Sequence, residues 1–177
     1  MLAPDEVLLR TFLVDAIEGL PLPSPWVLVQ DPGGQPVFNN GSTGVFSKRH
    51  PFEAPLAELA AVFRAALPAG ATDRGRLLAT VREHWEAEVR GEFAKWYPVR
   101  LDDQWEYYCH AESGETMWER PESVLLPPHF MRTRALDRLV SEGHLARLRA
   151  RARSGGRLVQ DEVLVPVAGR AGGGGPG

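Results

Sequence analysis

The side chains with the clearest potential for chemistry are aromatic, and they gather between Trp96 and Pro121. Three short runs rich in aromatic residues, Trp96–Arg100, Trp105–Cys109 and Glu115–Trp118, are separated by turn-forming residues. This pattern predicts a three-stranded antiparallel sheet. A sheet of this size buries little surface, so a few aromatics and prolines must supply most of its stability. The chemistry it favours is non-covalent recognition by aromatic side chains.

No catalytic constellation accompanies these aromatics. The five histidines have no metal-ligand spacing with acidic residues or with Cys109, the only cysteine. The Pro32-Gly33-Gly34 sequence fits a hairpin turn and not a phosphate-binding loop. We therefore expect a non-enzymatic protein without a metal or a cofactor.

The composition indicates a chain that does not enter membranes. Its 177 residues are 44% apolar and 24% charged, enough for one compact domain or several small modules. No run approaches the roughly 18 consecutive apolar residues that cross a bilayer, and the acidic start lacks the features of a signal peptide. A lone cysteine cannot form an internal disulfide, which fits a cytoplasmic or other reducing compartment.

Charge is unevenly distributed along the chain. Between Glu83 and Glu122 there are 11 acidic and 4 basic residues, a net of −7. Between Phe130 and Arg157 there are 8 arginines and 2 acidic residues, a net of +6. The two segments could pair with each other, bind outside partners, or form solvated helix faces.

The spacing of residues from Trp96 to Pro121 resembles the WW domain, a small proline-recognising sheet. That family has a first Trp, an aromatic pair 11 and 12 residues later, a Thr at +20, a second Trp at +22 and a Pro at +25. The corresponding residues here are Trp96, Tyr107, Tyr108, Thr116, Trp118 and Pro121, with Gly114 in the second turn.

The resemblance implies a role for each matched position. Trp96, Tyr108 and Pro121 would form a structural buckle on one face of the sheet. Tyr107, Trp118 and Thr116 would line a groove on the other face that takes a polyproline II segment. Cys109 and Ala111 occupy the positions of the family's tyrosine-ligand pocket but differ from its usual residues, which argues against PPxY recognition. Asp102 and Asp103 in the first loop argue against a phosphoserine ligand, because carboxylates repel phosphate.

A second, degenerate match lies between Leu22 and Pro51. Its buckle positions are kept, whereas the groove positions carry Val37 and Lys48 instead of Tyr and Trp. The buckle residues are Pro23, Trp26, Phe38 and Pro51. We expect a WW-like unit without the usual ligand groove, or alternatively an unrelated β-hairpin. Since Trp26 and Trp96 lie 70 residues apart and a helical pattern precedes each, an internal duplication is suggested.

Amphipathic patterns predict helices at Pro4–Glu18, Pro55–Leu67 and Asp73–Lys95. The third helix carries apolar residues at every fourth position and should pack on another helix; these residues are Leu77, Val81, Trp85, Val89 and Phe93. Because this helix runs directly into Trp96, the second sheet should be rigidly attached.

The sequence of the C-terminal third predicts an extended segment, a helix, a strand and a glycine-rich tail, in that order. Leu125–Phe130, with its Pro127-Pro128 pair, fits an extended strap, or a PPxF ligand for a WW groove. Arg132–Arg153 fits a basic helix broken at Gly143, and Leu158–Val167 fits a lone strand. The glycine-rich end should be disordered.

The fold class expected is therefore α+β: small three-stranded sheets joined by amphipathic helices. The predicted units are an N-terminal helix (1–19), a degenerate WW-like unit (20–54), a helical connector (55–95), a WW domain (96–124), a proline strap with a basic helix (125–155) and an extended segment with a glycine-rich tail (156–177).

The expected function is that of a scaffold protein whose second WW domain binds proline-rich segments of other proteins. The N-terminal helix and the following Leu-Pro-x-x-Trp sequence also resemble the amino-terminal region of some centrosomal and ciliary proteins. That resemblance implies a cytoskeletal setting, such as a cilium or axoneme, and other subunits of such an assembly as partners. A structural subunit with a covered groove and an RNA-processing adaptor are the alternatives. Direct nucleic-acid binding is not expected, because the arginines from Arg147 to Arg153 alternate and would spread around a helix.

Overall fold

The computed structural model describes residues 4–154, and these residues have the predicted α+β architecture. The helices are α1 (Pro4–Ile17), α2 (Glu53–Ala66), α3 (Ala71–Phe93), α4 (Pro121–Val140) and α5 (Glu142–Ser154). One three-stranded antiparallel sheet contains β1 (Trp26–Gln30), β2 (Pro36–Asn40) and β3 (Phe46–Ser47). The other contains β4 (Trp96–Arg100), β5 (Glu106–His110) and β6 (Thr116–Met117). The tail and the strand predicted at Leu158–Val167 lie outside the described residues.

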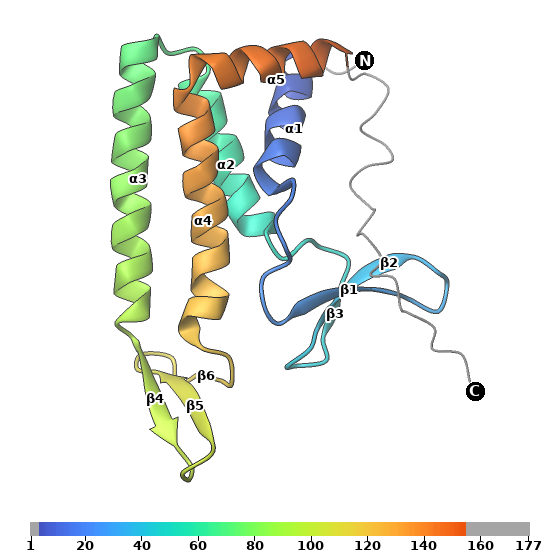
Figure 1. Ribbon diagram of the computed structural model, residues 1–177, viewed down its shortest axis with the longest axis vertical. Helices are drawn as coiled ribbons and strands as arrows, with labels where there is room; N and C mark the ends of the chain where they lie inside the picture. Colours follow the sequence, from blue (N-terminus) through green and yellow to red (C-terminus); the bar gives the residue numbers. More distant parts are fainter. Residues whose placement is uncertain (1–3, 155–177) are drawn as a thin grey trace, which may run out of the picture.

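The helices form one body, and the two sheets lie at one end of it. Figure 1 shows α3, α4, α2 and α1 side by side, with α5 lying across the end of the bundle opposite the sheets. Each sheet is connected to the bundle by a helix on both sides: α1 and α2 flank the first sheet, and α3 and α4 flank the second. Among residues 4–154, no helix combines the length and the apolar character needed to cross a membrane.

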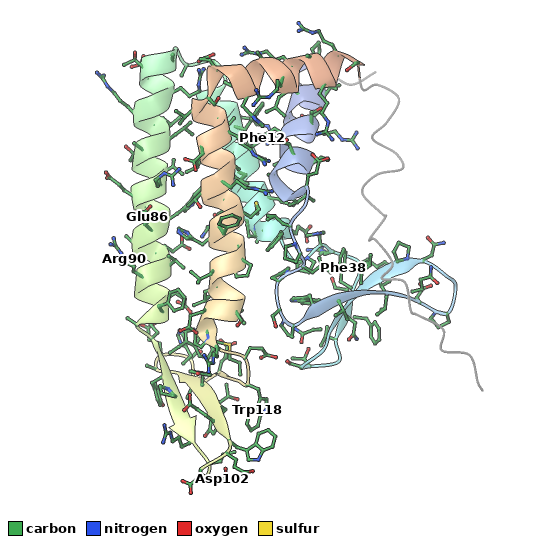
Figure 2. All side chains as sticks on the ribbon, in the orientation of Figure 1. Phe12, Phe38, Glu86, Arg90, Asp102 and Trp118 are labelled. Atoms are coloured by element: carbon green, nitrogen blue, oxygen red, sulfur yellow. The ribbon has the colours of Figure 1, made fainter. Side chains whose placement is uncertain are left out.

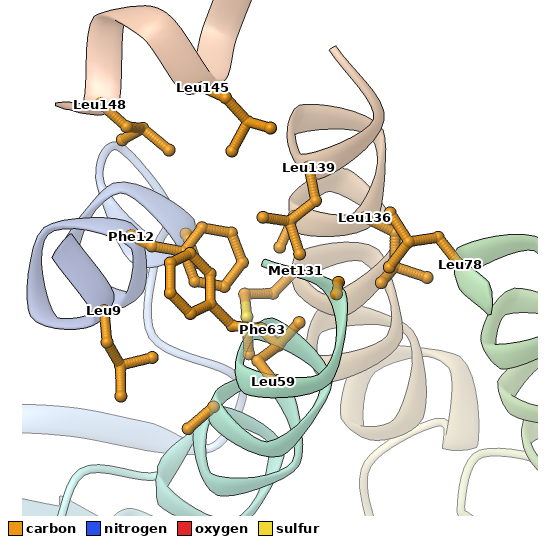
Figure 3. Close-up of a cluster of buried hydrophobic side chains, with 14 of the residues drawn as sticks. Leu9, Phe12, Leu59, Phe63, Leu78, Met131, Leu136, Leu139, Leu145 and Leu148 are labelled. Carbon is orange, nitrogen blue, oxygen red and sulfur yellow. The ribbon is translucent and has the colours of Figure 1, made fainter. Parts of the chain in front are cut away.

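The hydrophobic core lies among the helices and not in the sheets. Phe12 of α1 stacks on Phe63 of α2 with 4.9 Å between ring centroids, and both side chains are almost fully buried. The pair belongs to one buried cluster to which all five described helices contribute side chains (Figure 3). They include Leu9, Leu59, Leu78, Met131, Leu136, Leu139, Leu145 and Leu148. Burial of these apolar side chains, at roughly 1.5–3 kcal/mol each, is the main source of stability.

The two sheets are structural repeats of each other at an offset of 70 residues. Every strand boundary in the first sheet reappears 70 positions later in the second. The strand register is also the same: Trp26 pairs with Asn40 as Trp96 pairs with His110. With the flanking helices included, the repeated unit is helix, three strands, helix, which fits the suggested duplication.

The turns of the two sheets are also equivalent. Gly44 and Gly114 occupy the same place, with φ angles of +70° and +72°, a region that residues with a Cβ rarely adopt. The N–H of Gly44 donates to the Asn40 carbonyl at 2.7 Å, and that of Gly114 donates to the His110 carbonyl at 2.9 Å. Glycine at both positions therefore fixes the same tight turn between the last two strands of each sheet.

The prediction that the apolar stripe packs α3 on another helix is confirmed, since α3 packs against α4. Trp85 is buried as predicted, and the Arg132 guanidinium lies over its ring at 4.8 Å, but the other buried positions of α3 are Arg74 and Leu78. A strict four-residue spacing turns by about 40° per step around a helix with 3.6 residues per turn. The stripe therefore drifts around α3, but Leu77 and Val81 still pack, partly buried, against the same core as Trp85.

The proline strap prediction was wrong. Leu125–Phe130 belongs to α4, with Pro127 and Pro128 inside the helix, so the segment is not a polyproline II ligand for either sheet. Each proline lacks the N–H of a helical hydrogen bond. The later turns of α4 bury Met131, Leu136 and Leu139, and this packing keeps the helix formed despite the prolines.

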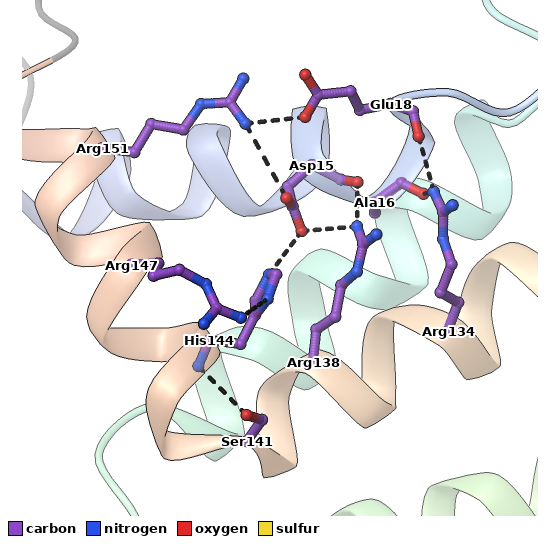
Figure 4. A network of polar contacts seen from close by, with 9 residues as sticks. All are labelled: Asp15, Ala16, Glu18, Arg134, Arg138, Ser141, His144, Arg147 and Arg151. Atoms are coloured by element: carbon purple, nitrogen blue, oxygen red, sulfur yellow. Dashed lines mark hydrogen bonds and ion pairs between the residues drawn. The ribbon is translucent and has the colours of Figure 1, made fainter.

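The predicted basic helix consists of two helices, and most of its arginines are engaged inside the protein. α4 ends at Val140 and α5 begins at Glu142, so the break lies near Ser141 and not at Gly143. Arg132 binds Glu58 at 2.6 Å. Figure 4 shows that arginines of α4 and α5 converge on the C-terminal end of α1, around the Asp15 carboxylate. The basic segment therefore pairs largely with helices outside the acidic segment.

Lowering the pH from about 7 to about 5 is expected to destabilise the fold. Burial lowers the pKa of His50, whose Nδ1 accepts a hydrogen bond from the Phe52 N–H at 3.0 Å. Because the folded-state pKa lies below 6.5, the unfolded chain binds more protons, and stability falls as the pH drops through and below this value. Urea denaturation at the two pH values checks this. The His50→Asn variant should lose less stability than the wild type over this interval, and an equal loss would contradict the assignment to His50.

Candidate functional site

The second sheet presents two chemically different faces. Successive strand residues point to opposite faces, so Tyr107 and Cys109 of β5 lie on one face and Tyr108 and His110 lie on the other. Cross-strand pairing places Val99 opposite Tyr107 on the first of these faces. We call the Tyr107 side the groove face and the Tyr108 side the buckle face.

The groove face carries an exposed aromatic pair. The rings of Tyr107 and Trp118 are 5.8 Å apart at 61°, and Trp118 is 58% exposed. These two residues and Thr116 line a pocket of about 290 Å³ together with Leu101 and Met117. Three of the five predicted groove residues are thus brought together, and Figure 2 shows Trp118 projecting from the free end of the sheet.

The other two predicted groove residues do not line this pocket. Cys109 is half-buried beside Tyr97 in the neighbouring strand, and a hydrogen bond with its thiol raises the pKa of Tyr97. Ala111 is exposed in the turn after β5, where its N–H donates to the Lys95 carbonyl at 2.8 Å.

Three residues near the groove were not predicted as part of it. Leu101 and Met117 line the pocket, and the Trp105 ring packs edge-on against Trp118 at 6.4 Å. Trp105 was assigned to a strand, but β5 begins at Glu106 and Trp105 belongs to the preceding loop. The sequence signal that could have pointed to Trp105 is an aromatic residue two positions after the Asp102-Asp103 turn.

The buckle face is anchored to the helices. Trp96 packs edge-on against the His110 ring at 5.0 Å, and its Nε1 donates to Glu92 of α3 at 3.3 Å. The Tyr108 hydroxyl donates to Glu106 at 3.0 Å, which raises the pKa of Tyr108. Pro121 is buried where α4 begins. Since only Ala94 and Lys95 separate α3 from β4, the second sheet is attached without a flexible linker, as predicted.

The first sheet lacks the aromatic pair. At the positions of Tyr107 and Trp118 it carries Val37, which is only 5% exposed, and Lys48, which is exposed. Among its predicted buckle residues, Pro23 is buried, whereas Trp26, Phe38 and Pro51 are half-buried. The Phe38 ring packs edge-on against His50 at 5.0 Å. This sheet therefore keeps the packing positions but has no aromatic groove.

Comparison of the chain with known proteins finds no matching family model, no matching curated protein and no matching solved structure. Within residues 4–154, no group of three or more His, Cys, Asp or Glu side chains is placed to hold a metal ion.

Proposed function

We propose that this protein is a non-enzymatic adaptor whose second sheet acts as a WW domain and binds proline-rich segments of other proteins. The observation that supports this most directly is the exposed, angled pair of Tyr107 and Trp118 beside a shallow pocket. Two aromatic walls at 61° to each other suit the ridge of a polyproline II helix. Such a ligand is already extended before binding and loses little conformational entropy.

The exposure of the groove favours this proposal over a purely structural subunit. Trp118 remains 58% exposed, so residues 4–154 leave most of its surface open. The first sheet has the same strand register without the aromatic pair, which suits a unit that serves only to pack. For the setting we propose a cytoskeletal assembly of a cilium or axoneme, on the resemblance of the N-terminal region to centrosomal and ciliary proteins.

Replacing Trp118 with alanine is expected to weaken proline-peptide binding by at least about thirtyfold, the loss typical of a central aromatic at an interface. The fold should survive because Trp118 is exposed and outside the hydrophobic core. Titration of the full chain with proline-rich peptides, followed by the indole NMR signals, measures the binding. Circular dichroism confirms that the helices remain.

The matched control is Lys48→Ala, which removes the side chain at the equivalent position of the first sheet. This variant should bind peptide as the wild type does. Unchanged binding by Trp118→Ala would show that the groove is not the binding site. Failure of the folded wild-type protein to bind any peptide in the panel would overturn the adaptor proposal and favour the structural subunit.

A further inference from the structure

The end of α5 carries an exposed serine that follows several arginines. Ser154 is the last residue of α5, and arginines stand one, three and five positions before it. These arginines are Arg149, Arg151 and Arg153. Basophilic serine kinases recognise such a pattern, because their acidic residues bind the arginines and so place the hydroxyl beside ATP. The sequence therefore supplies the recognition elements for transfer of a phosphoryl group to Ser154.

Two other serines of the described chain also follow an arginine by three positions, but their surroundings differ. Ser123 has an acidic residue directly before it, which opposes binding to an acidic kinase surface. Ser141 follows Arg138, whose Nη1 donates to the Asp15 Oδ2 at 2.8 Å, so this arginine is engaged inside the fold. Among the serines of residues 4–154, Ser154 alone has more than one arginine at these three positions.

The last turn of α5 buries little surface. The Ser154 Oγ donates to the Ala150 carbonyl at 2.9 Å and to the Arg151 carbonyl at 3.2 Å, and both contacts are exposed. Leu148 is the last buried residue of α5, and among residues 149–154 only Ala152 packs partly against the core. Kinases bind their substrates in an extended form, and helix ends fray because their last carbonyls lack partners within the helix. Opening this turn therefore presents Ser154 to a kinase with little loss of buried surface.

The same turn connects α5 to α1 through an arginine. The Arg151 Nη1 lies 2.9 Å from the Glu18 Oε2 and 4.0 Å from the Asp15 Oδ1 (Figure 4). Arg151 precedes Ser154 by three positions, and side chains at this spacing are neighbours on a helix. A phosphate on Ser154 would carry nearly two negative charges and would compete with Glu18 for this guanidinium. Negative charge is also unfavourable at the C-terminal end of a helix.

We propose that Ser154 is a phosphorylation site for a basophilic serine kinase, and that its phosphate loosens the end of α5 from α1. In the transfer, the Ser154 Oγ forms a bond to the γ-phosphorus of ATP, while the bond from that phosphorus to the bridging oxygen breaks and ADP leaves. The hydroxyl proton passes to a carboxylate of the kinase. This site does not depend on ligand binding by the second sheet.

The test uses the full folded chain with protein kinase B and ATP. This kinase selects serines with arginines three and five positions before them, which are Arg151 and Arg149 here. Mass spectrometry should find close to one phosphate per chain, and peptide fragmentation should place it on Ser154. A synthetic peptide of residues 147–157 is the reference substrate. The folded chain should have a kcat/KM within about tenfold of the peptide's, because fraying helix ends open at almost no cost in free energy.

Three variants locate the site. Ser154→Ala should abolish the phosphorylation. Ser123→Ala removes another exposed serine that follows an arginine, and it should leave the phosphorylation unchanged. Arg149→Gln should lower kcat/KM by about tenfold or more, the effect of losing one contact to a charged group. The fold should survive this last change because Arg149 is exposed.

Hydrogen exchange measures the effect of the phosphate on α5. Amides of residues 151–154 should exchange about two- to fivefold faster in the phosphorylated chain, because charge at a helix terminus has an effect of this size. Each rate is compared with that of the matching peptide, with or without phosphate, to remove the intrinsic effect of the modification. The amide of Leu145 should not change, since this residue is fully buried in the core.

The outcomes separate the site from its effect. If the peptide is not phosphorylated, the arginine pattern is not a recognition sequence, and the site is overturned. If the peptide is phosphorylated but Ser154 of the folded chain is not, α5 protects the serine, and the site is again overturned. If Ser154 is phosphorylated but exchange in the last turn is unchanged or slower, the loosening of α5 is overturned.

Discussion

Replacing Phe63 with alanine is expected to lower the free energy of unfolding by about 3–5 kcal/mol. Phe63 is 1% exposed and stacks on Phe12, itself fully buried, at the centre of the helical body (Figure 3). The substitution removes a buried ring and leaves a cavity that close-packed neighbours cannot fill. Since small proteins are stable by only about 5–15 kcal/mol, this single change removes a large share of the total.

Urea denaturation followed by circular dichroism measures this loss. Phe46→Ala is the matched control, because it deletes the same ring from a position that is 65% exposed, and it should change stability by less than about 0.5 kcal/mol. Phe63→Leu should cost less than Phe63→Ala because it conserves most of the volume. A loss below about 1 kcal/mol in Phe63→Ala would contradict the packing around this pair.

Replacing Asp15 with alanine is expected to cost about 2–4 kcal/mol and to loosen α5 first. The Asp15 side chain is 11% exposed, and its Oδ2 accepts hydrogen bonds from Arg138 at 2.8 Å and His144 at 2.9 Å (Figure 4). Removing the carboxylate leaves two partly buried donors without their acceptor. The expected loss of stability is smaller than for a fully buried ion pair, because the side chains of Arg138 and His144 are 26% and 17% exposed.

Hydrogen exchange distinguishes this local effect from global unfolding. Amides of α5 should exchange faster in Asp15→Ala, while those of α3, which does not contact Asp15, should change less. Glu18→Gln is the control: Glu18 pairs with Arg151 at 2.9 Å but is 56% exposed, so its loss should cost less than about 1 kcal/mol. Equal effects of the two substitutions would contradict a special role for the buried carboxylate.

The sheets were predictable from sequence because their signals are local. Aromatic residues set the strands, and a glycine such as Gly114 sets a turn that residues with a Cβ rarely adopt. These signals placed β4 correctly and β5 and β6 within one residue at each end. The pairing of Tyr107 with Trp118 was implied by the resemblance to the WW domain. Trp105 was missed because its role depends on a contact across the sheet.

The helices were less predictable where tertiary packing overrides local preference. The Pro127-Pro128 pair predicts an extended segment, yet buried residues further along α4 stabilise the helical form. The residues that pair with the arginines of α4 and α5 could not be predicted from the sequence either. Arg138 meets Asp15 more than a hundred positions away, a contact that charge counting along the chain cannot locate.

The direct junctions between helices and the second sheet have a mechanical consequence. Trp118 lies three positions before Pro121, where α4 begins, and α4 continues into the helical body. A partner held in the groove would therefore be held at a fixed angle to the whole protein, with almost no search radius of its own. A force on that partner would be transmitted to the packed helices, because no flexible linker lies between them and the groove. If the proposed binding occurs, this arrangement would set the orientation of the bound partner at the expense of reach.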